Sequence, residues 1–225
     1  RRLLMRRGIG DGVDAGALGG RLRHFIDRSG TFALPNKKAA YELTHIIFYM
    51  TDYGRRTAQL EADALTSLEY AGVLAFLDQD MDLLAEICTA LEFAGATPSA
   101  VWRDAVAGAH NAMTLYAQPG APLNDGFHAY LVTGWALHTD GQRAFTAAVP
   151  EGSVRFDTNG PAQSALRPIS AWLGETTERP RNRGDWGAVR ADILSRLDET
   201  KAAVLERAER STPVFAAFFE RFARV

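Results

Sequence analysis

Apolar side chains recur every three or four residues along most of this chain, the spacing that gathers them on one face of an α-helix. The clearest example follows Thr97 and Pro98, because proline is favoured at the first position of a helix. From there a single apolar stripe runs through Trp102, Val106, Ala109, Met113 and Tyr116. No segment alternates with period two for long enough to predict a strand, although residues 153–157 fit either a short strand or a loop. The pattern therefore predicts an all-α protein.

Residues that start and stop helices divide this pattern into separate elements. Asn36 and Asp80 stand where N-caps are expected, and Gly30 and Gly54 follow the last residues of two apolar stripes. We expect helices over residues 21–29, 36–52, 58–78, 80–95, 98–116, 125–139 and 185–210, with a last one beginning at Thr212 and Pro213.

A weak internal repeat relates three of these helices. Residues 41–54 align without gaps with residues 82–95, and the segment that ends at Gly141 has the same outline. The closing glycines, Gly54, Gly95 and Gly141, lie 41 and 46 residues apart, and a period of about 40–47 residues is typical of helical-hairpin arrays. We therefore predict an antiparallel helical-hairpin array, either a short solenoid or an α/α toroid.

Composition along the chain predicts its domain organisation. Residues 1–20 are rich in glycine and arginine, which predicts a flexible lead-in. Residues 21–225 are expected to form one helical domain, with an irregular insertion at residues 142–184 where the helical periodicity fades. Hydrophobic residues make up 47% of the 225 positions, the balance of a packed globular protein.

The charge and the cysteine content limit which partners and which cellular compartment we expect for this protein. The formal net charge is −2 and the pI is about 6.2, which gives no basic surface for nucleic acid or an anionic membrane. Cys88 is the only cysteine and lies in an apolar run, which predicts a small buried side chain and no intrachain disulfide. No apolar run is long enough to cross a bilayer. We therefore expect a cytoplasmic protein, and arginine far outnumbering lysine indicates a bacterial one.

The helix predicted over residues 36–52 combines apolar residues on every side with four polar ones. His45 and Asp52 lie seven positions apart, as do Thr44 and Thr51, so the members of each pair differ by only about 20° of helical rotation. The four residues therefore form a polar stripe on an otherwise apolar helix. Burying such groups without partners is costly, so we expect the stripe to face matching polar groups or water in a pocket.

The repeat supplies partners for this stripe. In its register His45 corresponds to Glu86, which shares a face with Asp82, and His128 on the third repeated helix shares a face with Asn124. If these helices form one inner layer, the histidines and carboxylates converge on one pocket. We expect the catalytic residues to be His45, Asp52 and His128, with the substrate bound by Tyr41, Thr44, Phe48, Glu86, Tyr130 and Trp135.

Three interpretations of this polar cluster stay open. Histidine beside a carboxylate transfers protons near neutral pH, which predicts acid–base chemistry. The same groups suit zinc, iron or manganese, but Glu42 and His45 are a lone Glu-x-x-His pair, so we expect no metal site and no cofactor. The third interpretation is structural, with polar groups that only hydrogen-bond between helices. The remaining sequence candidates, His24 and His110, look like surface residues.

Two segments carry a resemblance to known proteins. Tyr41–Gly54 (YELTHIIFYMTDYG) and Phe127–Thr133 resemble segments of uncharacterised all-helical proteins from actinobacterial biosynthetic gene clusters. The resemblance implies a place in bacterial secondary metabolism and no particular reaction. We therefore expect a protein that binds a small molecule or peptide. If it is also an enzyme, we expect it to tailor a natural product by acid–base chemistry.

The alternative function is a non-catalytic helical scaffold that mediates protein–protein interaction. The C-terminal helix offers one candidate surface, a homodimer contact through Phe215, Phe218, Phe219 and Phe222. A closed pocket around the histidines would favour the first function, whereas an open groove beside an exposed apolar patch would favour the second.

Overall fold

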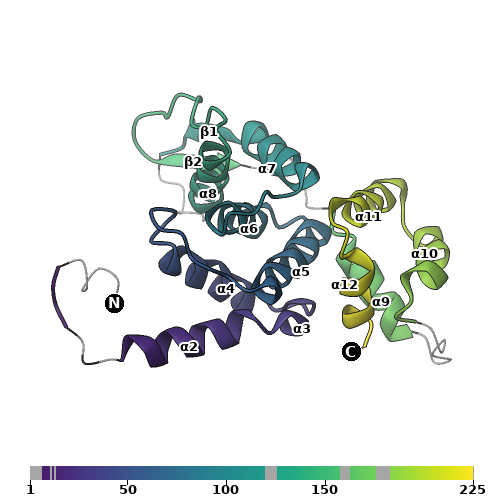
Figure 1. Cartoon of the computed structure of the whole chain (residues 1–225). Helices are drawn as coiled ribbons and strands as arrows, with labels where there is room; N and C mark the ends of the chain where they lie inside the picture. Colours follow the sequence, from purple (N-terminus) through teal and green to yellow (C-terminus); the bar gives the residue numbers. More distant parts are fainter. Residues whose placement is uncertain are drawn as a thin grey trace.

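The computed structural model describes residues 7–10, 12, 14–119, 126–157, 163–175 and 183–224, and it confirms the all-α fold class (Figure 1). The elements in chain order are α2 (Ala15–Ile26), α3 (Ser29–Phe32), α4 (Lys37–Met50), α5 (Ala62–Asp78), α6 (Met81–Phe93), α7 (Ala100–Ala112), β1 (Thr114–Ala117), α8 (Gly126–Thr139), β2 (Val154–Asp157), α9 (Leu166–Glu175), α10 (Trp186–Ser195), α11 (Glu199–Ser211) and α12 (Phe215–Phe222). The two strands pair antiparallel, with Thr114 opposite Asp157.

Side-chain caps account for where several helices begin. Asn36 accepts a hydrogen bond from the backbone N–H of Ala39 at the start of α4, and Asp80 accepts one from Leu83 at the start of α6. Each cap satisfies a backbone donor that has no partner inside the helix. These starts therefore depend on residues within three positions of one another, which is why the sequence predicts them well.

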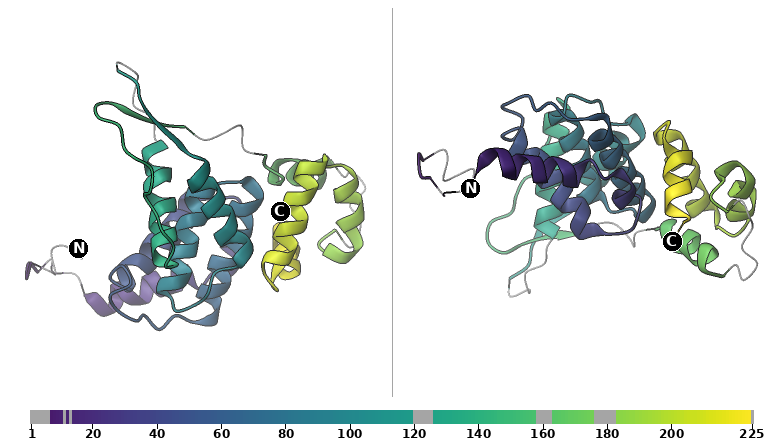
Figure 2. Two further views of the ribbon diagram at one scale, coloured as in Figure 1. Left: turned by 90° about the horizontal axis from the view of Figure 1, so that it is seen from above. Right: turned by 60° about the horizontal axis from the view of Figure 1, so that its bottom comes forward.

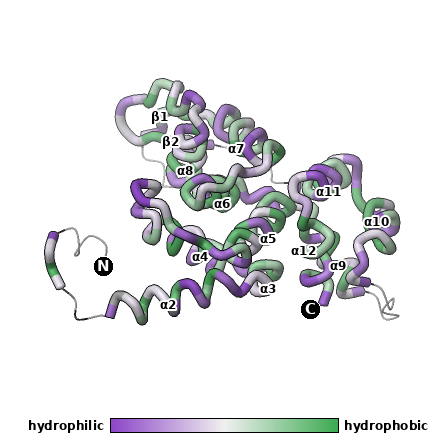
Figure 3. Tube along the Cα trace, in the orientation of Figure 1, coloured by the Kyte–Doolittle hydropathy of each residue, from purple (hydrophilic) through white to green (hydrophobic). Residues whose placement is uncertain are grey.

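Helices α2 to α8 form a first group, and α6 lies at its centre. It packs against α4 and α8 on two sides and against α5 and α7 elsewhere, and the segment from Leu83 to Leu91 is buried throughout. Figure 3 shows hydrophobic positions concentrated along α5 and α6, which lie among the other helices. The placement of α4, α6 and α8 side by side agrees with the inner layer that the repeat predicts.

Helices α9 to α12 form a second group beside the first (Figure 2). Helix α11 contacts α5 and α7, while α9 and α12 contact α5. The single helix expected over residues 185–210 is wrong, because α10 ends at Ser195 and Asp198 caps a new helix, α11, by accepting from the N–H of Lys201.

The aromatic face of α12 is covered within the chain. Phe218 packs edge-on against Tyr70 of α5, and Phe219 packs against Trp186 of α10. All four phenylalanines of α12 are buried. The rings of this face are therefore covered by helices of the same chain, and a homodimer contact through α12 stays a prediction.

Two predicted irregular segments contain regular structure. Helix α2 begins at Ala15, and Asp14 caps it by accepting a hydrogen bond from the backbone N–H of Gly16. The flexible lead-in was predicted to reach residue 20, so its last six residues are helical instead. The rest of that lead-in lies largely outside the described residues. The insertion at 142–184 contains β2 and the helix α9, which the sequence missed because Pro168 and the neighbouring glycines obscure its short apolar face.

Candidate functional site

The candidate site is built on the face of α6 that lies between α4 and α8. Asp82 and Glu86 are four residues apart on α6, so their carboxylates project from the same side of the helix. Neighbouring helices bring polar side chains to both carboxylates, His45 and two others from α4 and His128 from α8. We call the resulting cluster the α6 carboxylate site; its members are Tyr41, Thr44, His45, Asp82, Glu86 and His128.

Asp82 connects all three helices of the site. The hydroxyl of Tyr41 donates to its Oδ2 at 2.5 Å, and Nδ1 of His128 lies 2.8 Å from its Oδ1. An ionised carboxylate can only accept, so Nδ1 of His128 is the donor in this contact. Burial and the hydrogen bond to Asp82 raise the pKa of Tyr41 far above its ordinary value, so Tyr41 remains a donor.

Glu86 is the buried carboxyl of the site. Only 3% of its surface is exposed, the hydroxyl of Thr44 donates to its Oε2 at 2.5 Å, and Nε2 of His45 lies 3.5 Å from its Oε1. Burial raises the pKa of Glu86, and the hydrogen bond from Thr44 and the charge of His45 only partly oppose this. Glu86 therefore holds its proton to higher pH than an ordinary glutamate.

Both histidines stand at the surface rather than inside a pocket. The side chain of His45 is 48% exposed and that of His128 is 51% exposed. Each therefore has one side turned to a carboxylate of α6 and the other open to solvent. A molecule arriving from solution can reach both rings without any movement of the helices.

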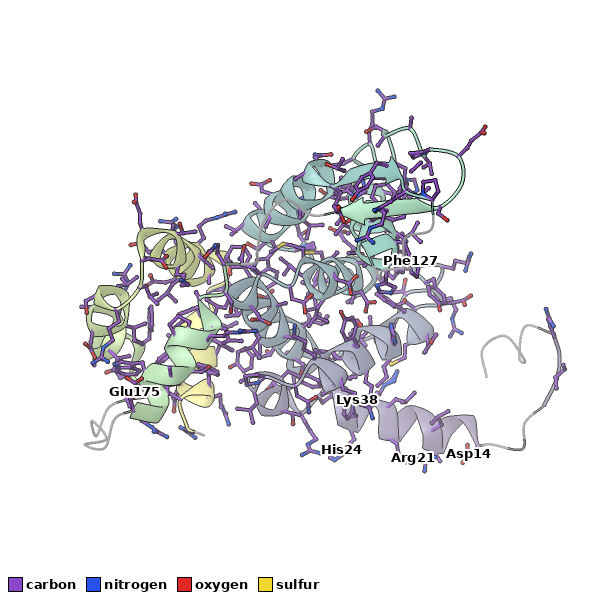
Figure 4. The ribbon with its side chains drawn as sticks, turned by 180° about the vertical axis from the view of Figure 1, so that it is seen from behind. Asp14, Arg21, His24, Lys38, Phe127 and Glu175 are labelled. Carbon is purple, nitrogen blue, oxygen red and sulfur yellow. The ribbon has the colours of Figure 1, made fainter. Side chains whose placement is uncertain are left out.

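Three large exposed hydrophobic residues lie close to the histidines in the sequence, and one of them, Tyr49, has its ring 6.3 Å from that of His45. Tyr49 on α4 and both Phe127 and Leu131 on α8 are large exposed hydrophobic residues. Phe127 lies at the first turn of α8, next to the β1–β2 pair, as Figure 4 shows from behind. We call these three residues the apolar rim. In the sequence, each of them lies within about one helical turn of His45 or His128.

The structure brings together most of the residues predicted for this site. Tyr41, Thr44, His45, Glu86 and His128 belong to the α6 carboxylate site, as the hydrogen bonds above show. Two predicted aromatic residues lie beside them, with the rings of Phe48 and Trp135 5.1 Å apart and the His45 ring 6.0 Å from Phe48.

Asp52 is displaced from the stripe on which it was predicted. Helix α4 ends at Met50, and Asp52 has a left-handed backbone with φ of 52°. The seven-residue register that placed Asp52 above His45 therefore does not extend to it. Asn124, predicted to share a face with His128, lies outside the described residues.

Tyr130 belongs to a different cluster, on the side of α8 that faces α7. Its ring stacks on His110 at 4.8 Å and packs against Phe145 and Phe156. The surface position expected for His110 is also wrong, because His110 is buried and its Nδ1 lies 2.9 Å from Oγ1 of Thr133. Burial lowers the pKa of His110, which keeps this ring neutral in the interior.

Asp82 is the functional candidate that the sequence undervalued. Its position on the face of Glu86 is readable from the sequence, but the number of its partners is not. One signal was present: in the internal repeat Asp82 occupies the position of Tyr41, the residue that donates to it. Equivalent positions on adjacent repeated helices commonly lie side by side.

Within the described residues there is neither a metal-binding group nor a reactive thiol. The described residues contain no group of three or more histidine, cysteine, aspartate or glutamate side chains placed to hold a metal ion. Cys88 is buried, as expected, and burial raises its pKa to about 12. Among the described helices none combines the length and apolar character required to cross a bilayer.

The fold and the site define an all-α protein with two histidine–carboxylate pairs on its surface. The chain belongs to the family described as a domain of unknown function, DUF6902, whose model matches residues 1–225. No curated protein and no solved structure matches the sequence.

Proposed function

We propose that this protein binds a peptide, or a small molecule of similar chemistry, across the face formed by α4, α6 and α8. The observation that carries the proposal is the α6 carboxylate site itself, in which polar side chains from three helices converge beneath two half-exposed histidines. The partly exposed carboxylate of Asp82 suits a basic hydrogen-bond donor on the ligand, such as an amine or a guanidinium group.

The open geometry supports an extended ligand over an enclosed one. His45 and His128 are accessible from solution, and the apolar rim of Tyr49, Phe127 and Leu131 is exposed on the same two helices. A peptide segment with one basic and one apolar or aromatic side chain would use both features. The bound segment can belong to another protein. The proposal therefore includes a non-catalytic scaffold that mediates protein–protein interaction.

Acid–base catalysis is the second candidate function, and one specific contact favours it. Asp82 holds His128 by Nδ1, the arrangement that leaves Nε2 of a histidine directed at a substrate as general base. Glu86, with its raised pKa, lies on the same face and is suited to the role of acid. In this form His128 accepts a proton from the bound ligand, and Glu86, which is buried, returns one through the half-exposed ring of His45, 3.5 Å away. A setting in bacterial secondary metabolism is supported only by the resemblance of two helices.

Ligand binding can be tested with defined peptides. The probes are the capped tripeptide Leu-Arg-Tyr and the same peptide with glutamate in place of arginine, titrated while amide resonances of the protein are followed by NMR. We expect the arginine peptide to shift resonances of α4, α6 and α8 and to bind at least tenfold more tightly than the glutamate peptide. Binding of both peptides with equal affinity, or shifts confined to other helices, would contradict the proposal.

Substitution of the two histidines separates a binding role from a structural one. His45→Gln and His128→Gln should weaken binding of the arginine peptide at least tenfold while the free energy of unfolding changes by less than about 0.5 kcal/mol, because both rings are half exposed. His24→Gln, at an exposed position on α2 (Figure 4), is the matched control and should change neither quantity. Lower stability with unchanged binding in both variants would show that the site only holds the helices together.

A further inference from the structure

A second candidate site lies where α4, α5 and α6 meet α9, so it shares α4 and α6 with the α6 carboxylate site. A cavity of about 150 Å³ opens there between Phe32, Ala40, Leu74, Leu83 and Leu166. None of the members of the α6 carboxylate site lines it. Ala40 and Leu83 each adjoin a residue of that site in the sequence, but side chains next to each other on a helix point in different directions.

The interior of this cavity is apolar. Its buried walls come from Phe32, Ala40, Ala71, Leu74, Ala75, Leu83 and Leu166. The three alanines account for the open space, since no larger side chain extends into it from their positions. In other proteins, cavities of about this volume lined by leucine and phenylalanine bind benzene-sized molecules.

The mouth of the cavity is charged. Nζ of Lys37 lies 3.1 Å from Oδ2 of Asp78 and 2.8 Å from Oδ2 of Asp80, and the Lys37 side chain is 62% exposed. Ser164 donates to the other oxygen of Asp78 at 2.8 Å, and the other oxygen of Asp80 caps α6. The charged residues that line the cavity are therefore two carboxylates and one ammonium, a net charge of −1 at neutral pH.

We propose that this cavity binds a small apolar molecule that carries a protonated amine. The apolar body occupies the space between the alanines, and the ammonium group lies at the mouth beside Asp78 and Asp80. The two carboxylates carry one charge more than Lys37 neutralises, so the mouth attracts a cation and repels an anion. Because Lys37 is exposed on a flexible stem, it can move aside to let the ligand amine take its position.

Three ligands of one size and different charge test this proposal. Benzylamine, benzyl alcohol and benzoate are titrated separately into the full chain, with binding followed by calorimetry and by the methyl resonances of Leu74, Leu83 and Leu166. We expect benzylamine to shift these methyl resonances and to bind at least tenfold more tightly than benzoate, with benzyl alcohol between them. Benzoate binding as tightly as benzylamine would overturn the charge argument, and the absence of methyl shifts with all three would overturn the site.

Variants of the mouth sharpen the test without disturbing the packing. Lys37→Gln removes the competing ammonium and should raise the affinity for benzylamine several-fold. Asp78→Asn with Asp80→Asn should reduce the preference for benzylamine over benzyl alcohol at least fivefold, and asparagine at position 80 remains a good N-cap for α6. Unchanged affinities in both variants would show that the amine does not lie at the mouth.

A variant that fills the cavity provides an independent control. Ala40→Leu places a larger side chain at the wall and should abolish binding of all three ligands while far-UV circular dichroism stays unchanged. Unaltered benzylamine binding in a folded Ala40→Leu protein would locate the ligand elsewhere. Should this variant fail to fold, the Lys37 and aspartate variants still decide the proposal, because they alter only charge.

Discussion

Oδ1 of Asp82 and Nδ1 of His128 lie 2.8 Å apart, although the two residues are 46 positions apart in the chain. The same carboxylate accepts a hydrogen bond from Tyr41, so one side chain of α6 joins both flanking helices. The two partners differ in exposure, since Tyr41 is partly buried and the His128 side chain is half exposed. The two contacts should therefore contribute differently to stability.

Replacing Asp82 should cost more stability than replacing His128. Asp82→Ala removes a charged acceptor from Tyr41, and a lost hydrogen bond to a charged group costs about 1.5–3 kcal/mol. His128→Ala removes a half-exposed pair, which should cost less than about 1 kcal/mol. Urea unfolding of both variants measures the difference, and equal losses would mean that the Tyr41 contact adds nothing.

The hydroxyl of Thr44 should matter more than an equally buried hydroxyl elsewhere. Thr44→Val leaves the buried carboxyl of Glu86 without its donor, which should lower the free energy of unfolding by about 1–3 kcal/mol. Thr89 is equally buried, but its hydroxyl bonds only to the carbonyl of Ala85 in its own helix. Thr89→Val is therefore the control and should change stability by less than about 1 kcal/mol. Similar losses in the two variants would argue against a special role for Thr44.

Glu86 should make the protein less stable as the pH rises. Its folded pKa is raised above the ordinary value of 4.5, so the folded state binds the proton more tightly than the unfolded state does. The free energy of unfolding therefore falls from about pH 4.5 upward until the folded pKa is passed, and the loss then stays constant. His45, Asp82 and His128 face the same carboxyl and act on it through their charges.

Glu86→Gln isolates this contribution because glutamine cannot ionise. The variant should equal the wild type near pH 4 and become progressively more stable than it towards neutral pH, as measured by denaturant midpoints across that range. Glu42→Gln, on the exposed side of α4, should follow the wild-type profile. A Glu86→Gln profile parallel to that of the wild type would show that Glu86 ionises as an ordinary glutamate.

The aromatic face of α12 should be a main source of stability for the second group of helices. Phe218→Ala leaves a cavity between α12 and α5, and the expected cost is about 3–5 kcal/mol. Phe127→Ala is the matched control, since Phe127 is 46% exposed, and it should change stability by less than about 0.5 kcal/mol. Unchanged denaturant midpoints for Phe218→Ala would contradict the packing of α12 on α5.

Two helical glycines should respond in opposite directions to the same substitution. A Cβ at Gly72 of α5 would lie 2.5 Å from the ring of Trp102, so Gly72→Ala should destabilise by about 1–3 kcal/mol through overpacking. A Cβ at Gly108 of α7 meets no described atom within 4 Å, so Gly108→Ala should stabilise by about 0.5–1 kcal/mol. Thermal midpoints of the two variants moving in the same direction would contradict the close contact.

The sequence by itself determined the helical class, the starts of α4, α6 and α10, and the polar pair Thr44 and His45 on α4. Caps such as Asn36 and Asp80 act on backbone groups within three residues, so their effect is contained in the local sequence. The register of the internal repeat likewise paired His45 with Glu86, and the two side chains lie 3.5 Å apart. Glycine and cap signals did not place the end of α4, which was predicted at Asp52. The helix ends at Met50, two residues earlier.

Only the tertiary structure decided which polar residues are buried and which are exposed to solvent. His110 and His128 are both histidines on amphipathic helices, yet one is stacked between α7 and α8 and the other is half open to water. That difference depends on which helices pack against each face, and those contacts join residues more than 20 positions apart. Local propensity carries no information about such contacts, because they are selected by the burial of the whole apolar surface. The open α6 carboxylate site is the result of that packing.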